Sequence, residues 1–103
     1  MRKEIFYDKG AVEELHKFSE EIQKEFQAYI ALLSSEGRLE FPEARKVTRK
    51  LFEIRVIQKG VYRSFYAYLK RQYIVILHFF QKKTQKTPLK NIKIAEQRLK
   101  KYE

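Results

Sequence analysis

The sequence predicts a domain of the α+β class, with helices in the N-terminal third and at the C-terminus and an antiparallel sheet between them. Apolar residues recur at steps of three and four over residues 12–33, which is the pattern of one helix face. The period then changes to two, and residues 51–80 are rich in β-branched and aromatic side chains, as strands are. Helical spacing returns near the C-terminus, where one face carries Ile92, Ala95, Leu99 and Tyr102.

The N-terminal elements are a short strand and a helical hairpin. Glu4–Tyr7 is the expected strand. The helical stretch after it contains Ser19 followed by two glutamates, which is typical of an N-cap with acidic residues in the first turn. The stretch therefore predicts two helices, at about 10–18 and 20–35. Gly37 is placed to end the second one.

A polar connection over residues 38–49, which contains Phe41-Pro42, leads into the predicted sheet. Three strands are expected there: Leu51–Gln58, Val61–Leu69 and Tyr73–Phe80. The turns around Lys59-Gly60 and Lys70-Arg71 are short, so the strands form an antiparallel meander.

The C-terminal region is predicted to be a basic loop followed by a helix. The loop covers residues 81–87, and Thr87 followed by Pro88 predicts an N-cap and a first helical residue. The helix runs to about Tyr102. We expect the helices to cover one face of the sheet and to leave the other face, in the basic half, partly open.

Charge is distributed unevenly along the 103 residues, which form one domain. Residues 1–43 carry six basic and ten acidic side chains, whereas residues 44–103 carry seventeen basic and three acidic ones. A balance of +14 in the second segment favours a polyanionic partner such as nucleic acid or an acidic protein.

A membrane partner is disfavoured. The basic residues alternate with strand-like apolar residues and do not line an amphipathic helix. The longest apolar runs are far shorter than the roughly 20 residues of a membrane span. The N-terminus lacks the pattern of a signal peptide, so we expect a cytoplasmic protein.

Composition excludes several kinds of site. The chain has no cysteine, which excludes a disulfide scaffold, a thiol nucleophile and a cysteine-built zinc site. It also has no glycine-rich phosphate loop. Its two histidines, His16 and His78, are isolated, so we expect neither a metal nor a cofactor.

The remaining candidate site is a group of cations on the strands, and its geometry depends on one turn. A three-residue loop over 58–60 with glycine in a left-handed position would place Arg55 opposite Arg63. A two-residue Lys59-Gly60 turn would place Arg55 opposite Ser64 and Arg63 on the far face. We favour the three-residue loop. A two-residue Lys70-Arg71 turn would then bring His78 opposite Arg63, on the face that also carries Glu53.

Such a face suits the cleavage of RNA by its own 2′-hydroxyl. Arginine and lysine can stabilise the charged phosphorane, proton transfer can come from side chains, and aromatic rings can stack on bases. Structural interpretations compete with this one. Glu53 and Arg55 could form an exposed ion pair, His78 could be a satisfied core histidine, and the basic loop could be merely solvated.

Four segments together resemble the phage-derived Gp49-like group of HigB toxins in the RelE/ParE toxin superfamily. They are LFEIR (51–55), VYRSFYAYL (61–69), ILHFFQKKTQKTP (76–88) and IKIAEQRLKKY (92–102). The order is a strand ending in E-x-R, then Y-R-x-x-Y, then an apolar strand that continues into F-x-K-K-T-x-K-T-P. With the helical N-terminal half, the resemblance covers nearly the whole chain and implies a RelE-like fold.

The resemblance implies the toxin of a type II toxin–antitoxin pair, which cleaves mRNA on the ribosome without a metal. It implies that Arg63 contacts the scissile phosphate, that Arg55 is the basic residue of the preceding strand, and that Lys82 or Lys83 follows the last core strand. These four are the predicted catalytic residues. The residues predicted to bind RNA are Tyr66, His78, Lys86, Lys59 and Arg71. No residue corresponds securely to the C-terminal catalytic tyrosine of some members.

The resemblance also implies a cognate antitoxin, of helix-turn-helix type or with an acidic or helical segment that covers the basic face. The other partners are mRNA and the ribosome. Two alternatives remain from the sequence: a ParE-like inhibitor of DNA gyrase that acts by binding, and a non-enzymatic basic RNA-binding domain.

Overall fold

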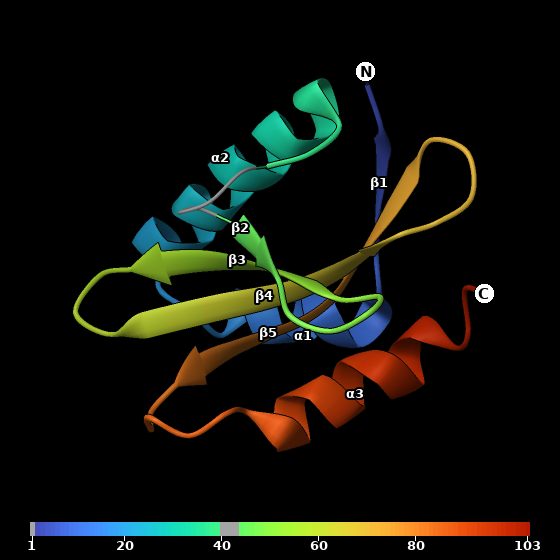
Figure 1. Ribbon diagram of the computed structural model, residues 1–103. Helices are drawn as coiled ribbons and strands as arrows, with labels where there is room; N and C mark the ends of the chain where they lie inside the picture. Colours follow the sequence, from blue (N-terminus) through green and yellow to red (C-terminus); the bar gives the residue numbers. More distant parts are fainter. Residues whose placement is uncertain (1, 40–43) are drawn as a thin grey trace.

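The chain folds into a five-stranded sheet with helices on both faces (Figure 1). The computed structural model describes residues 2–39 and 44–103. In chain order the elements are β1 (Glu4–Tyr7), α1 (Lys9–His16), α2 (Glu20–Glu36), β2 (Ala44–Lys46), β3 (Phe52–Ile57), β4 (Val61–Tyr68), β5 (Tyr73–Lys82) and α3 (Leu89–Leu99). The strand order in the sheet is β1-β5-β4-β3-β2. No helix in these ranges is long and apolar enough to cross a membrane.

The predicted α+β class and the β3-β4-β5 meander are confirmed, and the sheet is wider than predicted. β1 pairs with β5 in parallel, and β2 pairs with β3 in antiparallel fashion. β2 lies inside the segment predicted as a polar connection, whose Phe41-Pro42 is outside the described residues. Its sequence, Ala-Arg-Lys, carries no strand signal of its own, and these residues form a strand because they pair with β3.

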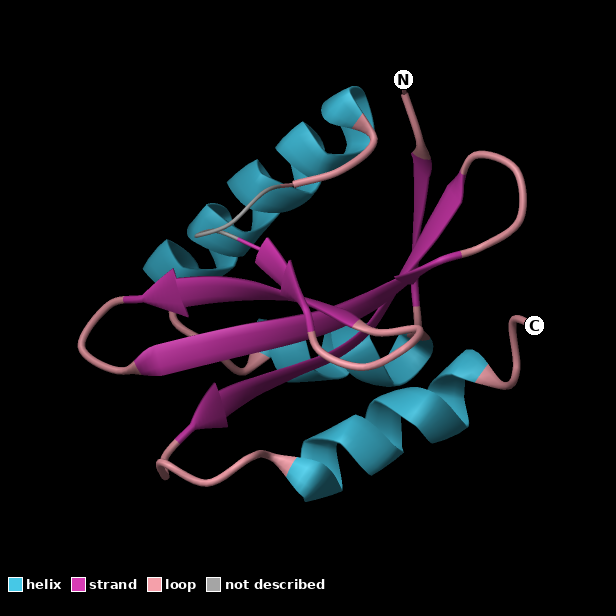
Figure 2. Cartoon of the chain, viewed as in Figure 1, coloured by secondary structure: helices cyan, strands magenta, loops and turns pink. Residues whose placement is uncertain are grey.

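Both faces of the sheet are covered, which corrects the prediction of one partly open face. One core cluster joins α1 and α2 to the face that carries Ile54, Tyr66 and Ile76. A second cluster joins α3 to the opposite face through Phe65 and Leu77. Figure 2 shows the helices of the N-terminal half and α3 on opposite sides of the strands. The apolar run of β5 is the physical reason, because residues 74–80 are buried on both faces of the strand.

The predicted ends of α2 are confirmed, and the predicted start of α3 is not. Ser19 accepts a hydrogen bond from the amide of Ile22, and Gly37 ends the helix with a φ of 83°. The N-cap of α3 is Pro88, without a side-chain hydrogen bond, so Thr87 does not cap the helix. The helix ends at Leu99, three residues before the predicted end.

The β3–β4 turn has the favoured three-residue length. Ile57 pairs with Val61, and Arg55 therefore stands opposite Arg63. The backbone differs in detail from the prediction, because Lys59 adopts the left-handed conformation (φ 48°) and Gly60 has a φ of 146°. A φ near +146° is accessible essentially to glycine alone, so Gly60 is still required by the backbone.

The predicted pairing of His78 with Arg63 is wrong. The β4–β5 connection is longer than a two-residue turn, since Tyr68 pairs with Ile74. A bulge at the Phe65/Tyr66 step shifts the register once more, so Phe65 faces His78 and Arg63 faces Phe80. The longer connection and the bulge each shift the register by one residue, and a total shift of two residues leaves side chains on the same face of the sheet. His78 therefore keeps the same face as Arg63 but lies farther along the strand.

The turn geometry generates a stability prediction. Gly60→Ala should lower the free energy of unfolding by about 1–3 kcal/mol, because an added Cβ is strained at this φ and lies 3.0 Å from the side-chain Nε2 of Gln81. Lys59→Gly should raise the free energy of unfolding by about 0.5–1 kcal/mol, since glycine relieves the left-handed strain. Urea denaturation of both variants measures these effects. A neutral Gly60→Ala variant would contradict the assignment of this turn.

Candidate functional site

One face of the sheet gathers the predicted catalytic arginines, and we call it the site face. Its charged members are Arg45 on β2, Glu53 and Arg55 on β3, Arg63 on β4 and Lys82 on β5. The register places them together: Arg45 opposite Glu53, Arg55 opposite Arg63, and Lys82 opposite Val61. Strand spacing then puts the Cα atoms of Arg55 and Lys82 within roughly 12 Å, which long side chains can span.

Glu53 is the fixed centre of this face. Its side chain is only 1% exposed. One carboxylate oxygen accepts a hydrogen bond from Arg63 Nη1 at 3.0 Å, and the other accepts one from Arg45 Nε at 2.8 Å. Arg63 is itself buried, with 8% of its side chain exposed, whereas Arg45 is half exposed. A buried carboxylate thus holds two guanidinium groups in set positions.

The accessible cations surround this buried pair. Arg55 and Lys82 are partly exposed, and Lys83 is fully on the surface, one residue beyond the end of β5. Lys59 in the β3–β4 turn is exposed at the same end of the sheet. Lys86 is exposed in the loop that follows β5. The structure therefore brings most of the predicted cations to one end of the molecule.

Arg71 lies at the other end of the sheet. It follows the far end of β4, so the rest of the strand separates it from Arg63 by roughly 20 Å. There it lines a pocket of about 440 Å³ together with Tyr68, Tyr73 and Tyr102. Arg71 therefore cannot contact the same phosphate as Arg55, and its predicted contact with RNA stays a prediction.

Tyr66 does not lie on the site face. Its ring belongs to the core on the α1–α2 side, stacks on Phe52 and has no exposed surface. Burial raises the pKa of its hydroxyl strongly, and the neighbouring Tyr68 adds to the increase. A base cannot stack on a ring with no exposed surface, so we do not retain Tyr66 among the residues proposed to bind RNA.

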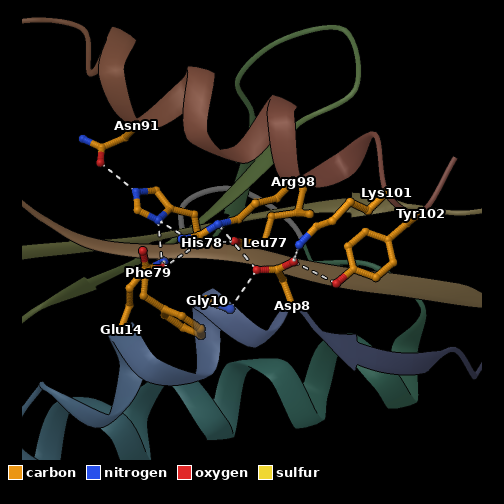
Figure 3. Close-up of polar contacts among 10 residues, drawn as sticks. All are labelled: Asp8, Gly10, Glu14, Leu77, His78, Phe79, Asn91, Arg98, Lys101 and Tyr102. Atoms are coloured by element: carbon orange, nitrogen blue, oxygen red, sulfur yellow. Dashed lines mark hydrogen bonds and ion pairs between the residues drawn. The ribbon is translucent and has the colours of Figure 1, made fainter.

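His78 is part of a partly buried polar cluster that joins α1, β5 and α3 (Figure 3). Its Nδ1 lies 2.8 Å from Glu14, and its Nε2 lies 2.7 Å from Asn91 on α3. Glu14 also accepts hydrogen bonds from Arg98 and from the amide of Phe79. With both ring nitrogens engaged and 4% exposure, His78 has a structural role, which the sequence left open as an alternative.

Asp8 anchors the second half of this cluster. It is 1% exposed and caps α1 by accepting a hydrogen bond from the amide of Gly10. Lys101 and the hydroxyl of Tyr102 both contact its other oxygen at 2.8 Å. Burial and the bond to Asp8 raise the pKa of Tyr102 to about 12, and this tyrosine connects α3 to α1.

Comparison with known proteins identifies the family. The family model for the phage derived protein Gp49-like matches residues 13–100 of the chain. The chain belongs to the Gp49-like family. No curated protein matches it.

Two solved structures share the fold of this Gp49-like chain. One chain of the toxin–antitoxin complex RelBE2 from Mycobacterium tuberculosis has a TM-score of 0.62 at 20% identity, over 80% of this chain and 100% of that one. A mutant of the E. coli toxin RelE in the free state has a TM-score of 0.69 at 12% identity, over 98% of each chain. The Gp49-like chain therefore has the RelE fold.

Sequence reasoning missed the residues that position the site of this Gp49-like protein. Arg45 was part of a predicted connection, and its role follows from the β2–β3 pairing, which the sequence does not signal. Glu14 and Arg98 lie far apart in the chain and meet only around His78. The one available signal was Glu53, an acid in an otherwise apolar and basic strand pattern.

The buried ion pair generates a second prediction. Glu53→Gln should lower the free energy of unfolding by about 3–5 kcal/mol, because it leaves the buried Arg63 charge without its partner. Arg55→Gln, which changes a partly exposed neighbour on the same strand, should change it by less than about 0.5 kcal/mol. Urea denaturation measures both. Equal effects of the two substitutions would show that Glu53 does not anchor the site face.

The Asp8–Glu14 cluster generates a third prediction, for stability against pH. Burial by itself raises the pKa of Asp8, but hydrogen bonds from Lys101, Tyr102 and the Gly10 amide outweigh it, so the pKa is lowered. Burial by itself also raises the pKa of Glu14. The hydrogen bonds to Glu14 from His78, Arg98 and the Phe79 amide together outweigh it, so this pKa is lowered too.

A carboxyl group whose pKa is lower in the folded protein stabilises the fold at pH values above its pKa in the unfolded chain. These unfolded pKa values are about 3.9 for Asp and 4.3 for Glu. This stability is lost as the pH falls through the folded pKa values. Urea unfolding at pH 7, 5, 4 and 3 should therefore show a steep loss below about pH 5 for the wild type. An Asp8→Asn/Glu14→Gln variant should show a flatter dependence, while Glu13→Gln, an exposed neighbour on α1, should follow the wild type. Parallel curves for all three proteins would refute the role of the cluster.

Proposed function

We propose that this protein is the toxin of a type II toxin–antitoxin pair and cleaves mRNA on the ribosome without a metal. Membership in the Gp49-like family and the RelE fold support the toxin class. The observation that carries the cleavage proposal is the Arg55–Arg63 pair, opposed on neighbouring strands with Arg63 fixed by buried Glu53.

The proposed reaction is an attack of the RNA 2′-hydroxyl on the adjacent phosphorus. A bond forms between the 2′-oxygen and phosphorus, and the bond from phosphorus to the 5′-oxygen breaks. The 2′-proton leaves to a base, and the departing 5′-oxygen takes up a proton. Negative charge builds on the phosphorane oxygens between these events, so preorganised cations are the main requirement.

Arg55 and Arg63 are proposed to divide this work. Arg55 is the accessible member, and its guanidinium can approach the phosphate directly. Arg63 is held by Glu53 and is almost fully buried, so it contributes a fixed positive field and its small exposed edge. This division differs from the expectation that Arg63 is the principal phosphate contact.

Lys82 and Lys83 are proposed to hold the RNA backbone or to assist proton transfer. Lys82 shares the site face, and Lys83 lies on the surface at the same end. Lys59 and Lys86 extend the positive surface on either side and are proposed to contact flanking phosphates. His78 is not proposed to contact RNA, because both of its ring nitrogens are engaged by Glu14 and Asn91.

The proposed partners are mRNA, the ribosome and a cognate antitoxin, and the proposed place of action is the cytoplasm. A solved structure of the same fold is a toxin–antitoxin complex, which supports the antitoxin. The excess of basic residues in 44–103 favours an antitoxin that covers this half with an acidic or helical segment, or a helix-turn-helix protein bound beside it.

A cleavage assay tests the proposal. Purified protein is mixed with a defined mRNA, with and without programmed ribosomes, and EDTA is added to the ribosome-free reactions. The wild type should cleave only with ribosomes. Arg55→Gln should cleave roughly 100-fold more slowly, as expected for the loss of one group that stabilises transition-state charge. Lys17→Gln, a surface change beyond the end of α1, is the matched control and should cleave at the wild-type rate.

Three results would contradict the proposal in different ways. Cleavage without ribosomes would retain a nuclease but change its substrate to free RNA. Equal rates for Arg55→Gln and the control would remove Arg55 from the site. No cleavage in either condition would favour the gyrase-inhibitor alternative, and loss of DNA supercoiling would then be the decisive measurement.

A further inference from the structure

A second basic surface lies between the β2–β3 turn and the C-terminal half of α3, and we call it the α3 groove. It is a depression of about 500 Å³. Its charged lining residues are Arg49, Lys50, Lys93, Glu96, Lys100 and Glu103. None of these residues belongs to the site face or to the predicted site.

The α3 groove has a net positive charge, because four cations line it and only two carboxylates do. Lys50 pairs with Glu103 at 2.7 Å, so these two charges neutralise each other. Arg49, Lys93 and Lys100 are exposed and have no ion pair with any residue that the structure describes. Glu96 is the remaining negative charge, and the groove is left with an excess of cations.

The cations are arranged along a line. Lys93 on α3 and Lys100 at its C-cap are seven residues apart, which is two helical turns, so they point the same way about 10 Å apart, with Glu96 between them. Lys90 precedes them on the same stripe. Arg49 stands on the opposite wall, in the turn between β2 and β3. A row of charges on two walls suits an extended polyanion better than a single small anion.

The lining of the α3 groove disfavours a protein segment as its occupant. Protein interfaces are centred on buried apolar and aromatic anchors. Among the residues that line this groove the apolar one is Leu99, which is already buried in the core below α3. The large apolar side chains that are exposed among the described residues, such as Phe6, Leu32 and Ile57, are not part of the lining.

The α3 groove lies on the same side of the sheet as the site face. Leu99 packs in one core cluster with Leu51, which precedes β3. Along β3 the next residues on that face are Glu53 and then Arg55, at about 3.3 Å per residue. Arg45, on β2, stands beside Glu53 between the groove and Arg55. Cations therefore continue from the groove to the proposed cleavage site.

We propose that the α3 groove binds the phosphate backbone of the RNA that flanks the cleavage site, through Arg49, Lys93 and Lys100. The inference rests on the proposed function, and it adds where the RNA runs after it leaves Arg55. The contacts go to phosphates, so the groove binds RNA without base preference.

Binding measurements test this apart from cleavage. The probe is a fluorescein-labelled 12-nucleotide oligo(U), titrated with protein at several salt concentrations and followed by fluorescence anisotropy. The groove variant is Arg49→Gln/Lys93→Gln/Lys100→Gln. The control variant is Lys9→Gln/Lys17→Gln/Lys24→Gln, which removes the same net charge from exposed positions on or next to α1 and α2. Binding of both variants to 70S ribosomes, measured by co-sedimentation, separates free RNA from ribosomal RNA as the source of the phosphates.

The groove variant should bind oligo(U) at least tenfold more weakly than the wild type at 0.1 M salt. Its slope of log affinity against log salt should fall by about 2, as expected for three lost phosphate contacts on a single strand. The control should lose less than about threefold. If only ribosome binding is lost, the groove binds the backbone of ribosomal RNA. The inference that it binds the mRNA flanking the cleavage site is then overturned.

Two other outcomes would overturn the inference, and a third would separate it from the proposed function. Equal losses in both variants would mean that only net charge matters. A groove variant that binds oligo(U) and ribosomes normally but loses affinity for an acidic antitoxin would make the groove a protein-binding surface. Because no cleavage is measured, a protein that fails the nuclease assay but shows the groove effect would refute the proposed function and leave the groove as an RNA-binding surface.

Discussion

The buried carboxylate of Glu53 is the interaction on which the site face depends. It binds two guanidinium groups from neighbouring strands, and its pair with Arg63 is almost entirely out of water. Removing a charge pair from water is costly unless hydrogen bonds satisfy both partners. The geometry of three strands therefore has to agree with this one residue. The β2–β3 register places Arg45 beside this residue, and the β3–β4 turn sets Arg63 and Arg55 opposite each other next to it.

The two polar clusters of the protein have opposite uses. The cluster around Glu53 contains more cations than it compensates and lies near Lys59 of the β3–β4 turn and Lys82 and Lys83 at the end of β5. The cluster around Asp8 and Glu14 is closed, because its acids, its histidine and Arg98 satisfy one another between α1, β5 and α3. One cluster thus leaves positive charge for a ligand, and the other fixes the helices that frame it.

Most local features of the fold were predictable from sequence, whereas the wider sheet and the exact β4–β5 register were not. Ser19, Gly37 and the turn before Gly60 act through their own backbone neighbourhoods, so their roles can be read from a few residues. The bulge at Phe65/Tyr66 and the length of the β4–β5 connection have no clear signal in the nearby sequence, and together they moved His78 away from Arg63. Burial is the second limit: the Y-R-x-x-Y pattern suggests two exposed ligands, but Tyr66 and Arg63 are both inside. Arg55 and Lys82 kept the accessibility that a site needs.

The closed cluster also protects a vulnerable edge of the sheet. β1 covers β5 only as far as Ile76, so the later part of β5 presents backbone groups on its outer side. Glu14 accepts a hydrogen bond from the amide of Phe79, and Arg98 donates one to the carbonyl of Leu77. Side chains therefore occupy these two positions of an edge that would otherwise template pairing with another chain. The same contacts that retain His78 in the core make this stretch of β5 a poor starting point for aggregation.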